Sequence, residues 1–167
     1  MSDSQQTGPD LVQLAHGGGG RLMHELIRDV FATAFEHSDF DPAHDAAVVP
    51  WPSSNLVFTT DSFVVTPLFF PGGDIGKLAV FGTCNDLSVS GGRPRYLSLG
   101  FVLEEGFSLK DLRKVLQSIV SAAVVSGVDI VTGDTKVVPH VKGGGIYINS
   151  TGIGERVFPF DLFPRAI

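Results

Sequence analysis

The sequence predicts an α+β fold, in which a mixed β-sheet is covered by helices on one face only. Apolar residues recur at helical spacing in two long segments, Arg21 to His37 and Ser108 to Gly127. Short β-type runs lie between and after these segments, so the order is helix, β, β, helix, β, helix, β, β. Two long helices against four or five strands are expected to cover one face of the sheet and to leave the other face needing a partner.

Composition limits the class of protein. A chain of 167 residues with 43% hydrophobic residues is long enough for one real core and too short for two full-sized domains. The net charge of -6 argues against non-specific nucleic-acid binding, which depends on lysine and arginine. Apolar runs fall short of the ~20 residues of a membrane span, and residues 1–10 do not resemble a secretory signal. We therefore expect a cytoplasmic protein without nucleic-acid or membrane partners.

The first third of the chain is expected to start with a disordered segment, residues 1–13. The glycine run Gly17 to Gly20 then precedes an amphipathic helix that extends from Arg21 to His37. Two β-type runs follow, Ala46 to Val49 and Asn55 to Thr60, and the prolines and serines between them suggest a hairpin.

The middle of the chain carries clear helix signals. Asp74 can cap a helix that should end at Gly91-Gly92, and Ser108 can cap another that should end at Gly127. Three further runs are expected to be strands: Tyr96 to Leu103, Val128 to Thr132 and Gly145 to Ile153. The apolar, proline-containing segment 157–167 has no such pattern and is expected to begin a linker to a second domain.

Acidic and amide side chains follow predicted strands or lie inside the middle helix. An aspartate just after an apolar strand is expected at the rim of a sheet, where several carboxylates can converge on Mg²⁺. Each one alone is more simply explained as a turn or cap residue, since aspartate is a common turn former. The candidates are Asp45, Asp61, Asn85, Asp86 and Asp134.

Phosphate could be bound by Lys136 and by the glycine run after His16. A glycine run before a helix offers free amides and the positive end of the helix dipole. The simpler alternatives are a solvated lysine and a flexible linker. The sequence contains no P-loop, dinucleotide, GxSxG or HExxH motif, so those enzyme classes have no support. Cys84, the single cysteine, is expected to be a core residue rather than a nucleophile.

Five sequence motifs cover residues 14–154: LAHGGGGRLM, DAAVV, the long segment from FTTDSF to VLEEG, IVTGDTKVV and IYINSTGIG. Together they resemble the HypE family of hydrogenase-maturation proteins. The broader pattern is shared with the aminoimidazole-ribonucleotide synthetase, selenophosphate synthetase and thiamine-phosphate kinase families. The resemblance implies a ferredoxin-like domain over residues 14–156 that dimerises through its sheet into a barrel. A C-terminal domain would complete the ATP site.

The resemblance also implies roles for individual residues in binding Mg²⁺ and ATP. Asp61, Asp86 and Asp134 would bind magnesium, with Asp45 a weaker candidate. Asn85 would support them, and Lys136 would contact phosphate. The family's N-terminal segment that closes over the nucleotide matches His16, Gly17, Gly18, Gly19 and Gly20. His44 stands where the family has the first of two aspartates, which puts a metal role for that position in doubt.

The implied activity is ATP-dependent dehydration of a carboxamide, carried on the enzyme's own C-terminal cysteine, to a thiocyanate for the cyanide ligands of [NiFe] hydrogenase. The resemblance implies as partners the carbamoyltransferase HypF, the HypC/HypD scaffold and a second copy of the chain. Since Cys84 is the single cysteine, the chain alone should lack complete turnover, and no catalytic side chain is assigned in it. Two alternatives are a superfamily member that phosphorylates a small molecule and a noncatalytic dimerisation module.

Overall fold

The computed structural model describes residues 11–17, 20–35, 51, 55–140 and 145–157. Its centre is a four-stranded sheet in which the strands lie in the order β1 (Leu56–Phe63), β6 (Ile146–Arg156), β4 (Gly92–Glu104) and β5 (Asp129–Val138). β6 pairs antiparallel with both β1 and β4, whereas β4 and β5 are parallel. The predicted mixed sheet is confirmed.

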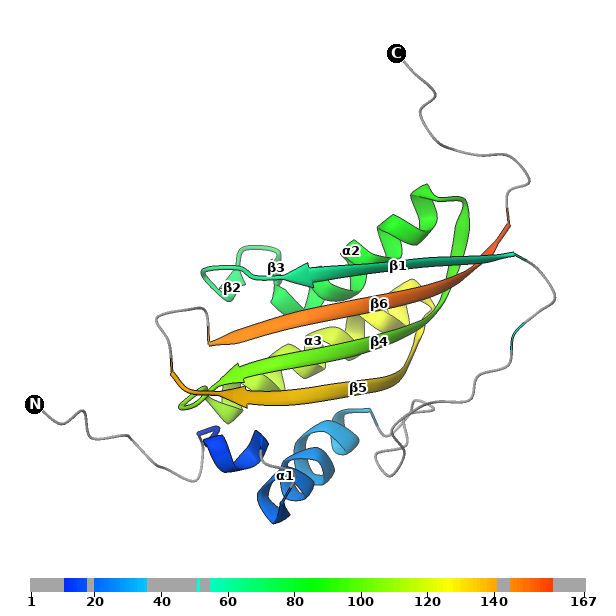
Figure 1. The fold of residues 1–167 in the computed structure, drawn as a ribbon. Helices are drawn as coiled ribbons and strands as arrows, with labels where there is room; N and C mark the ends of the chain where they lie inside the picture. Colours follow the sequence, from blue (N-terminus) through cyan, green and yellow to red (C-terminus); the bar gives the residue numbers. More distant parts are fainter. Residues whose placement is uncertain (1–10, 18–19, 36–50, 52–54, 141–144, 158–167) are drawn as a thin grey trace, which may run out of the picture.

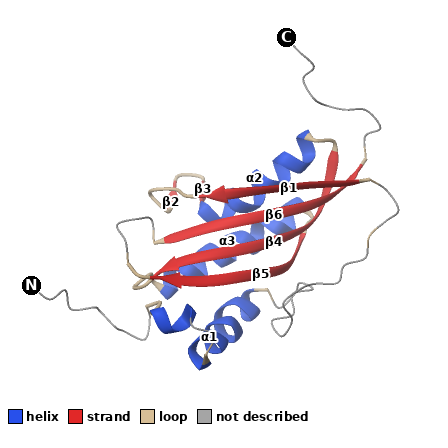
Figure 2. Cartoon of the chain, viewed as in Figure 1, coloured by secondary structure: helices blue, strands red, loops and turns tan. Residues whose placement is uncertain are grey.

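The helices lie on one side of this sheet. α2 (Ile75–Val89) and α3 (Leu109–Ser126) lie behind the four strands in Figure 1, and α1 (Arg21–Leu26) lies beside the β5 edge. The view coloured by secondary structure shows the same two layers, with the helices in blue and the sheet in red (Figure 2). The prediction of helices on one face is therefore confirmed.

Capping residues set the start of α2 and both ends of α3 as the sequence predicts. Asp74 Oδ1 accepts hydrogen bonds from the backbone N–H groups of Gly76 and Lys77 at 2.7 and 3.1 Å. Ser108 Oγ accepts from Asp111 N at 3.3 Å, and Gly127 ends α3 at φ 65°, a left-handed conformation that favours glycine.

The helix predicted from Arg21 begins at that residue, but its second half has a wider turn. α1 passes directly into η2 (Ile27–Ala32), which is π-helical, and residues 36–37 lie outside the described part of the chain. Thr33 Oγ1 donates to the carbonyl oxygen of Arg28, five residues earlier, at 3.2 Å. Buried side chains of this segment, Val30 and Phe31 among them, join the core.

Packing reaches further toward the N-terminus than the boundary predicted at residue 14. Val12 is 1% exposed and exchanges backbone hydrogen bonds with Gly106 and Phe107, which lie beyond the end of β4. The short η1 (Leu14–Gly17) follows and contacts β5. Residues 1–10 lie outside the described part of the chain, so the predicted disorder there stays a prediction.

Two further differences concern strands. The stretch between β1 and α2 contains a small hairpin of β2 (Phe69–Phe70) and β3 (Gly73–Asp74), whose two-residue strands carry no usable periodic signal. β1 pairs with β6, and the other arm of the hairpin predicted around residue 50, residues 46–49, lies outside the described residues.

The two faces of the sheet differ in character. Toward the helices, β4 contributes fully buried apolar side chains at alternate positions, with Phe101 stacked edge to face on Phe31 at 5.2 Å between ring centroids. The opposite face, which we call the open face, exposes apolar side chains that include Phe58 at 60% and Val102 at 37%. Among the described helices, none combines the length and the apolar character needed to cross a membrane.

Candidate functional site

Asp61 and Asp134 lie inside strands, whereas the sequence predicts that they follow them. β1 extends to Phe63, so Asp61 stands opposite Ser150 of β6. β5 extends to Val138, six residues beyond the predicted end, and Asp134 stands opposite Gly100 of β4. Gly133 and Asp134 weaken the strand signal after Thr132, but pairing with the long central β4 continues through this stretch.

Asp61 lies on the helix side of the sheet, next to α2. Its Oδ2 is 3.8 Å from where a Cβ would stand on Gly82, and its Oδ1 accepts a hydrogen bond from Ser62 N at 2.7 Å. Asn85 and Asp86 follow Gly82 by three and four positions, which places them one turn further along the same side of α2. Both are exposed. We call Asp61, Asn85 and Asp86 the α2 cluster.

A groove of about 230 Å³ crosses the open face of the sheet. The strand register places Gly100 of β4 between Asn149 on β6 and Asp134 on β5, so a glycine forms the floor of the groove. A Cβ on Gly100 would meet no atom closer than 3.8 Å, which confirms that space is open there. We call this the open-face groove, and its polar lining residues are Ser62, Asp134, Lys136, Tyr147 and Asn149.

Hydrogen bonds hold one wall of the groove in place. Asn149 Nδ2 donates to the carbonyl oxygen of Asp61 and to Ser62 Oγ, each at 3.0 Å. On the other wall, Lys136 Nζ lies 4.0 Å from Asp134 Oδ2, with the two side chains 64% and 68% exposed. An ion pair so long and so exposed contributes little, so both charges stay available to a ligand.

Tyr147 is held by a hydrogen bond to a buried carboxylate. Its hydroxyl donates to Glu104 Oε1 at 3.0 Å, and Glu104 is 1% exposed. The other oxygen, Oε2, lies 3.3 Å from His140 Nδ1 but without the orientation of a hydrogen bond. The contact is therefore an ion pair when the imidazole is protonated.

One chain does not bring Asp61 and Asp134 together. Asp61 and Asp134 lie on strands at opposite edges of the described sheet and on opposite faces. Three strand spacings separate them, about 14 Å. Across the described residues, no three side chains of His, Cys, Asp or Glu are close enough to share a metal ion. Asp45 and His44 lie outside the described residues.

The predicted phosphate-binding segment starts against β5. Gly17 lies so close to the strand that a Cβ would stand 2.8 Å from Val137 N, so only glycine fits. His16 Nδ1 accepts a hydrogen bond from Gln13 N at 2.8 Å. Gly20 is exposed just before α1, whereas Gly18 and Gly19 lie outside the described residues.

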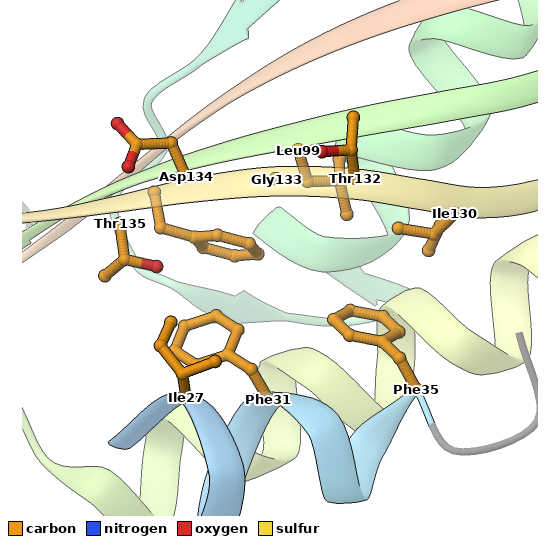
Figure 3. A pocket seen from close by; sticks show the side chains of 10 residues that line it. Ile27, Phe31, Phe35, Leu99, Ile130, Thr132, Gly133, Asp134 and Thr135 are labelled. Atoms are coloured by element: carbon orange, nitrogen blue, oxygen red, sulfur yellow. The ribbon is translucent and has the colours of Figure 1, made fainter. Parts of the chain in front are cut away.

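A slot between η2 and the sheet lies beside Asp134 but is too small to hold a nucleotide. Its volume is about 30 Å³, and Phe31 and Phe35 line it from below. Figure 3 shows the carboxylate of Asp134 on the side of β5 away from these rings, whereas Thr135 points toward them. Asp134 therefore belongs to the open-face groove.

Cys84 has the environment of a core residue. It is 7% exposed in α2, and burial raises the pKa of its thiol, although a hydrogen bond with Ser126 opposes part of that rise. A thiol with a raised pKa is a poor nucleophile at neutral pH.

The sequence pattern does not single out the groove residues Ser62, Gly100, Tyr147 and Asn149 as a site. Residues 145–153 do alternate, which puts Tyr147 and Asn149 on one face of a strand and is a usable signal for these two. Ser62 and Gly100 carry no signal of their own, because their place in the groove depends on the pairing of β1 and β4 with β6.

Comparison with known proteins gives consistent matches. Residues 43–156 match the family described as AIR synthase related protein, N-terminal domain. The carbamoyl dehydratase HypE of Azotobacter vinelandii is 52% identical over 143 residues, which cover 86% of this chain and 42% of that protein. The chain therefore spans about 42% of the length of this relative.

Solved structures agree with the sequence matches. A crystal structure of the hydrogenase maturation protein HypE in complex with ATP is 50% identical, with a TM-score of 0.83 over 87% of this chain and 43% of that one. A HypE–HypF complex contains a chain that is 45% identical, with a TM-score of 0.62 over 85% of this chain and 44% of that one. By its match over residues 43–156, the chain belongs to the AIR synthase related family and carries that family's N-terminal domain.

Proposed function

We propose that this chain is the magnesium-ATP-binding part of a HypE-type carbamoyl dehydratase. The observation that carries the proposal is its likeness to the HypE structure in complex with ATP, at 50% identity and a TM-score of 0.83. The relative from Azotobacter vinelandii, 52% identical, is named a carbamoyl dehydratase.

Magnesium would be held first by the α2 cluster. Asp61 and Asp86 supply carboxylate oxygens and Asn85 an amide oxygen, the hard donors that Mg²⁺ prefers. The fit is favourable because Asp61 lies beside α2 and the other two side chains follow along the same side of that helix. A bound cation would neutralise the charge that develops on a transferring phosphoryl group.

A second copy of the chain would supply the groove residues. Asp134 and Lys136 lie on the open face, far from the α2 cluster of their own chain, so a shared site requires another source. The open face exposes large apolar side chains such as Leu56, Phe58 and Val64, as a face covered by a partner does. We therefore propose a homodimer formed through the sheet.

The chemistry proposed for the whole protein is phosphoryl transfer. Phosphorylation of a carboxamide oxygen turns that oxygen into a leaving group, and loss of phosphate together with the N–H protons leaves a carbon–nitrogen triple bond. The task of this chain would be to position the triphosphate and to neutralise its charge. Cys84 is not the carrier of the carboxamide, because it is buried in α2.

The proposed partner is a HypF-type carbamoyltransferase. Support comes from the HypE–HypF complex, in which the matched chain is 45% identical to this one. The HypC/HypD scaffold and a cytoplasmic location stay predictions from the resemblance. Neither changes the nucleotide chemistry proposed for the described residues.

Calorimetric titration with ATP tests the proposal. Binding should require Mg²⁺, and Asp86→Asn should weaken it about tenfold or more, because one charged ligand is lost. Asp129→Asn is the matched control, since Asp129 is also exposed but lies at the start of β5. Binding that is absent in the wild type, or equally affected by the two substitutions, would contradict the proposal.

A further inference from the structure

Two buried hydroxyl groups have no hydrogen-bond partner among the described residues. Thr83 of α2 and Ser150 of β6 are each 0% exposed, and neither side-chain oxygen is paired. Buried polar groups are nearly always paired, because an unpaired one has lost its water without compensation. These two hydroxyls therefore call for an explanation other than packing.

Both hydroxyls lie in the layer that contains Asp61. Ser150 stands directly opposite Asp61 in the pairing of β6 with β1, so their Cβ atoms are about 5 Å apart. Thr83 packs its methyl group over Gly152, the next helix-facing position of β6, where a Cβ would stand 2.7 Å from Thr83 Cγ2. Its neighbour Gly82 is the residue on which a Cβ would stand 3.8 Å from Asp61 Oδ2.

The two oxygens of Asp61 are in different situations. Oδ1 accepts a hydrogen bond from Ser62 N, which fixes one side of the carboxylate. Oδ2 faces α2, the element that carries Thr83. Carboxylates that bind metal ions are usually held in orientation by hydrogen bonds from neighbouring groups. A hydroxyl on the α2 side can provide such a bond.

We propose that Thr83 and Ser150 are positioning residues for Asp61. Their hydroxyls donate hydrogen bonds to the carboxylate when it turns to hold a magnesium ion, and they stay buried and unpaired until then. This inference rests on the proposed function, because it takes Asp61 as a magnesium ligand. It adds that magnesium binding depends on the hydroxyls of Thr83 and Ser150 and not on the packing of these two side chains.

Two substitutions at Thr83 separate the hydroxyl from the methyl group. Thr83→Val keeps the shape and removes the hydroxyl, so stability is expected to be unchanged or raised. Thr83→Ser keeps the hydroxyl and removes the methyl that packs over Gly152, so stability is expected to fall. A merely structural role would leave magnesium binding unchanged in both variants.

The measurement is the Mg²⁺ concentration that gives half-maximal ATP binding, together with the melting temperature of the free protein. We expect Thr83→Val to raise this concentration about tenfold without lowering the melting temperature. Thr83→Ser should melt earlier but bind Mg²⁺ like the wild type. Ser150→Ala is a second route to the same test, and it should also raise the Mg²⁺ requirement.

The outcomes separate this inference from the proposed function. In one outcome, ATP binding depends on Mg²⁺ in the wild type, and Thr83→Val and Ser150→Ala need the same Mg²⁺ concentration as the wild type. That result overturns the positioning role and leaves the proposed function standing. A rise in the Mg²⁺ requirement of Thr83→Ser as large as that of Thr83→Val also overturns the positioning role, because the effect would then follow the packing of the side chain. A wild-type protein whose ATP binding ignores Mg²⁺ overturns the proposed function and this inference together.

Discussion

At the scale of single residues, Asp74 shows how one side chain joins two helices. Besides capping α2, it accepts a hydrogen bond from Ser118 Oγ of α3 through its Oδ2, at 2.5 Å. The side chain is 8% exposed, so these bonds are largely shielded from water. The start of α2 is therefore fixed both to its own first turn and to the neighbouring helix.

Removing this carboxylate should destabilise the fold. Asp74→Ala is expected to lower the free energy of unfolding by about 2 to 3 kcal/mol, because a helix cap is lost and buried donors are left unpaired. Asp74→Asn keeps one acceptor oxygen and should lose clearly less. Urea denaturation followed by circular dichroism gives both values. An alanine variant as stable as the wild type would contradict the role given to this side chain.

Cys84 gives a prediction about reactivity. Burial raises the pKa of its thiol, so at a given pH the reactive thiolate is scarcer than in an exposed cysteine. A thiol reagent should modify the native protein slowly at neutral pH, faster as the pH rises toward the raised pKa, and rapidly once urea unfolds the chain. Rapid modification of the native protein at pH 7 would contradict the buried placement.

At the scale of elements, two glycines in neighbouring strands have opposite surroundings. A Cβ on Gly152 of β6 would stand 2.7 Å from Thr83 and 2.9 Å from Leu87, whereas one on Gly100 of β4 would meet nothing closer than 3.8 Å. Gly152→Ala should therefore lower the free energy of unfolding by about 1 to 3 kcal/mol. Gly100→Ala should leave it unchanged or raise it, and equal effects in thermal melts would contradict this difference.

The elements also show what the sequence can and cannot predict. Asp74, Ser108 and Gly127 act through local bonds and backbone conformation, so the sequence predicts the start of α2 and both ends of α3 from them. The length of β5 depends on pairing with β4, a long-range contact that Gly133 and Asp134 do not signal. The acidic candidates could be selected from sequence, but the face each one occupies required the register.

At the scale of the whole molecule, the open face predicts self-association. Phe58 lies on this face and is 60% exposed, so Phe58→Lys should convert a dimer into a monomer without loss of stability. Val125 on α3 is 78% exposed on the helix side, and Val125→Lys is the matched control that should stay dimeric. Sedimentation velocity distinguishes the two. A wild-type monomer at micromolar concentration would contradict the proposed dimer.

The proposed site combines the α2 cluster of one copy with the groove of another, because Asp61 and Asp134 are separated in a single chain. The most direct test mixes two variants, Asp61→Asn and Asp134→Asn, and measures magnesium-dependent ATP binding. Each variant alone should fail to bind. The exchanged mixture should recover about a quarter of the wild-type sites, since mixed dimers contain one intact site each. A mixture that binds no better than its separate components would contradict a site shared between two copies.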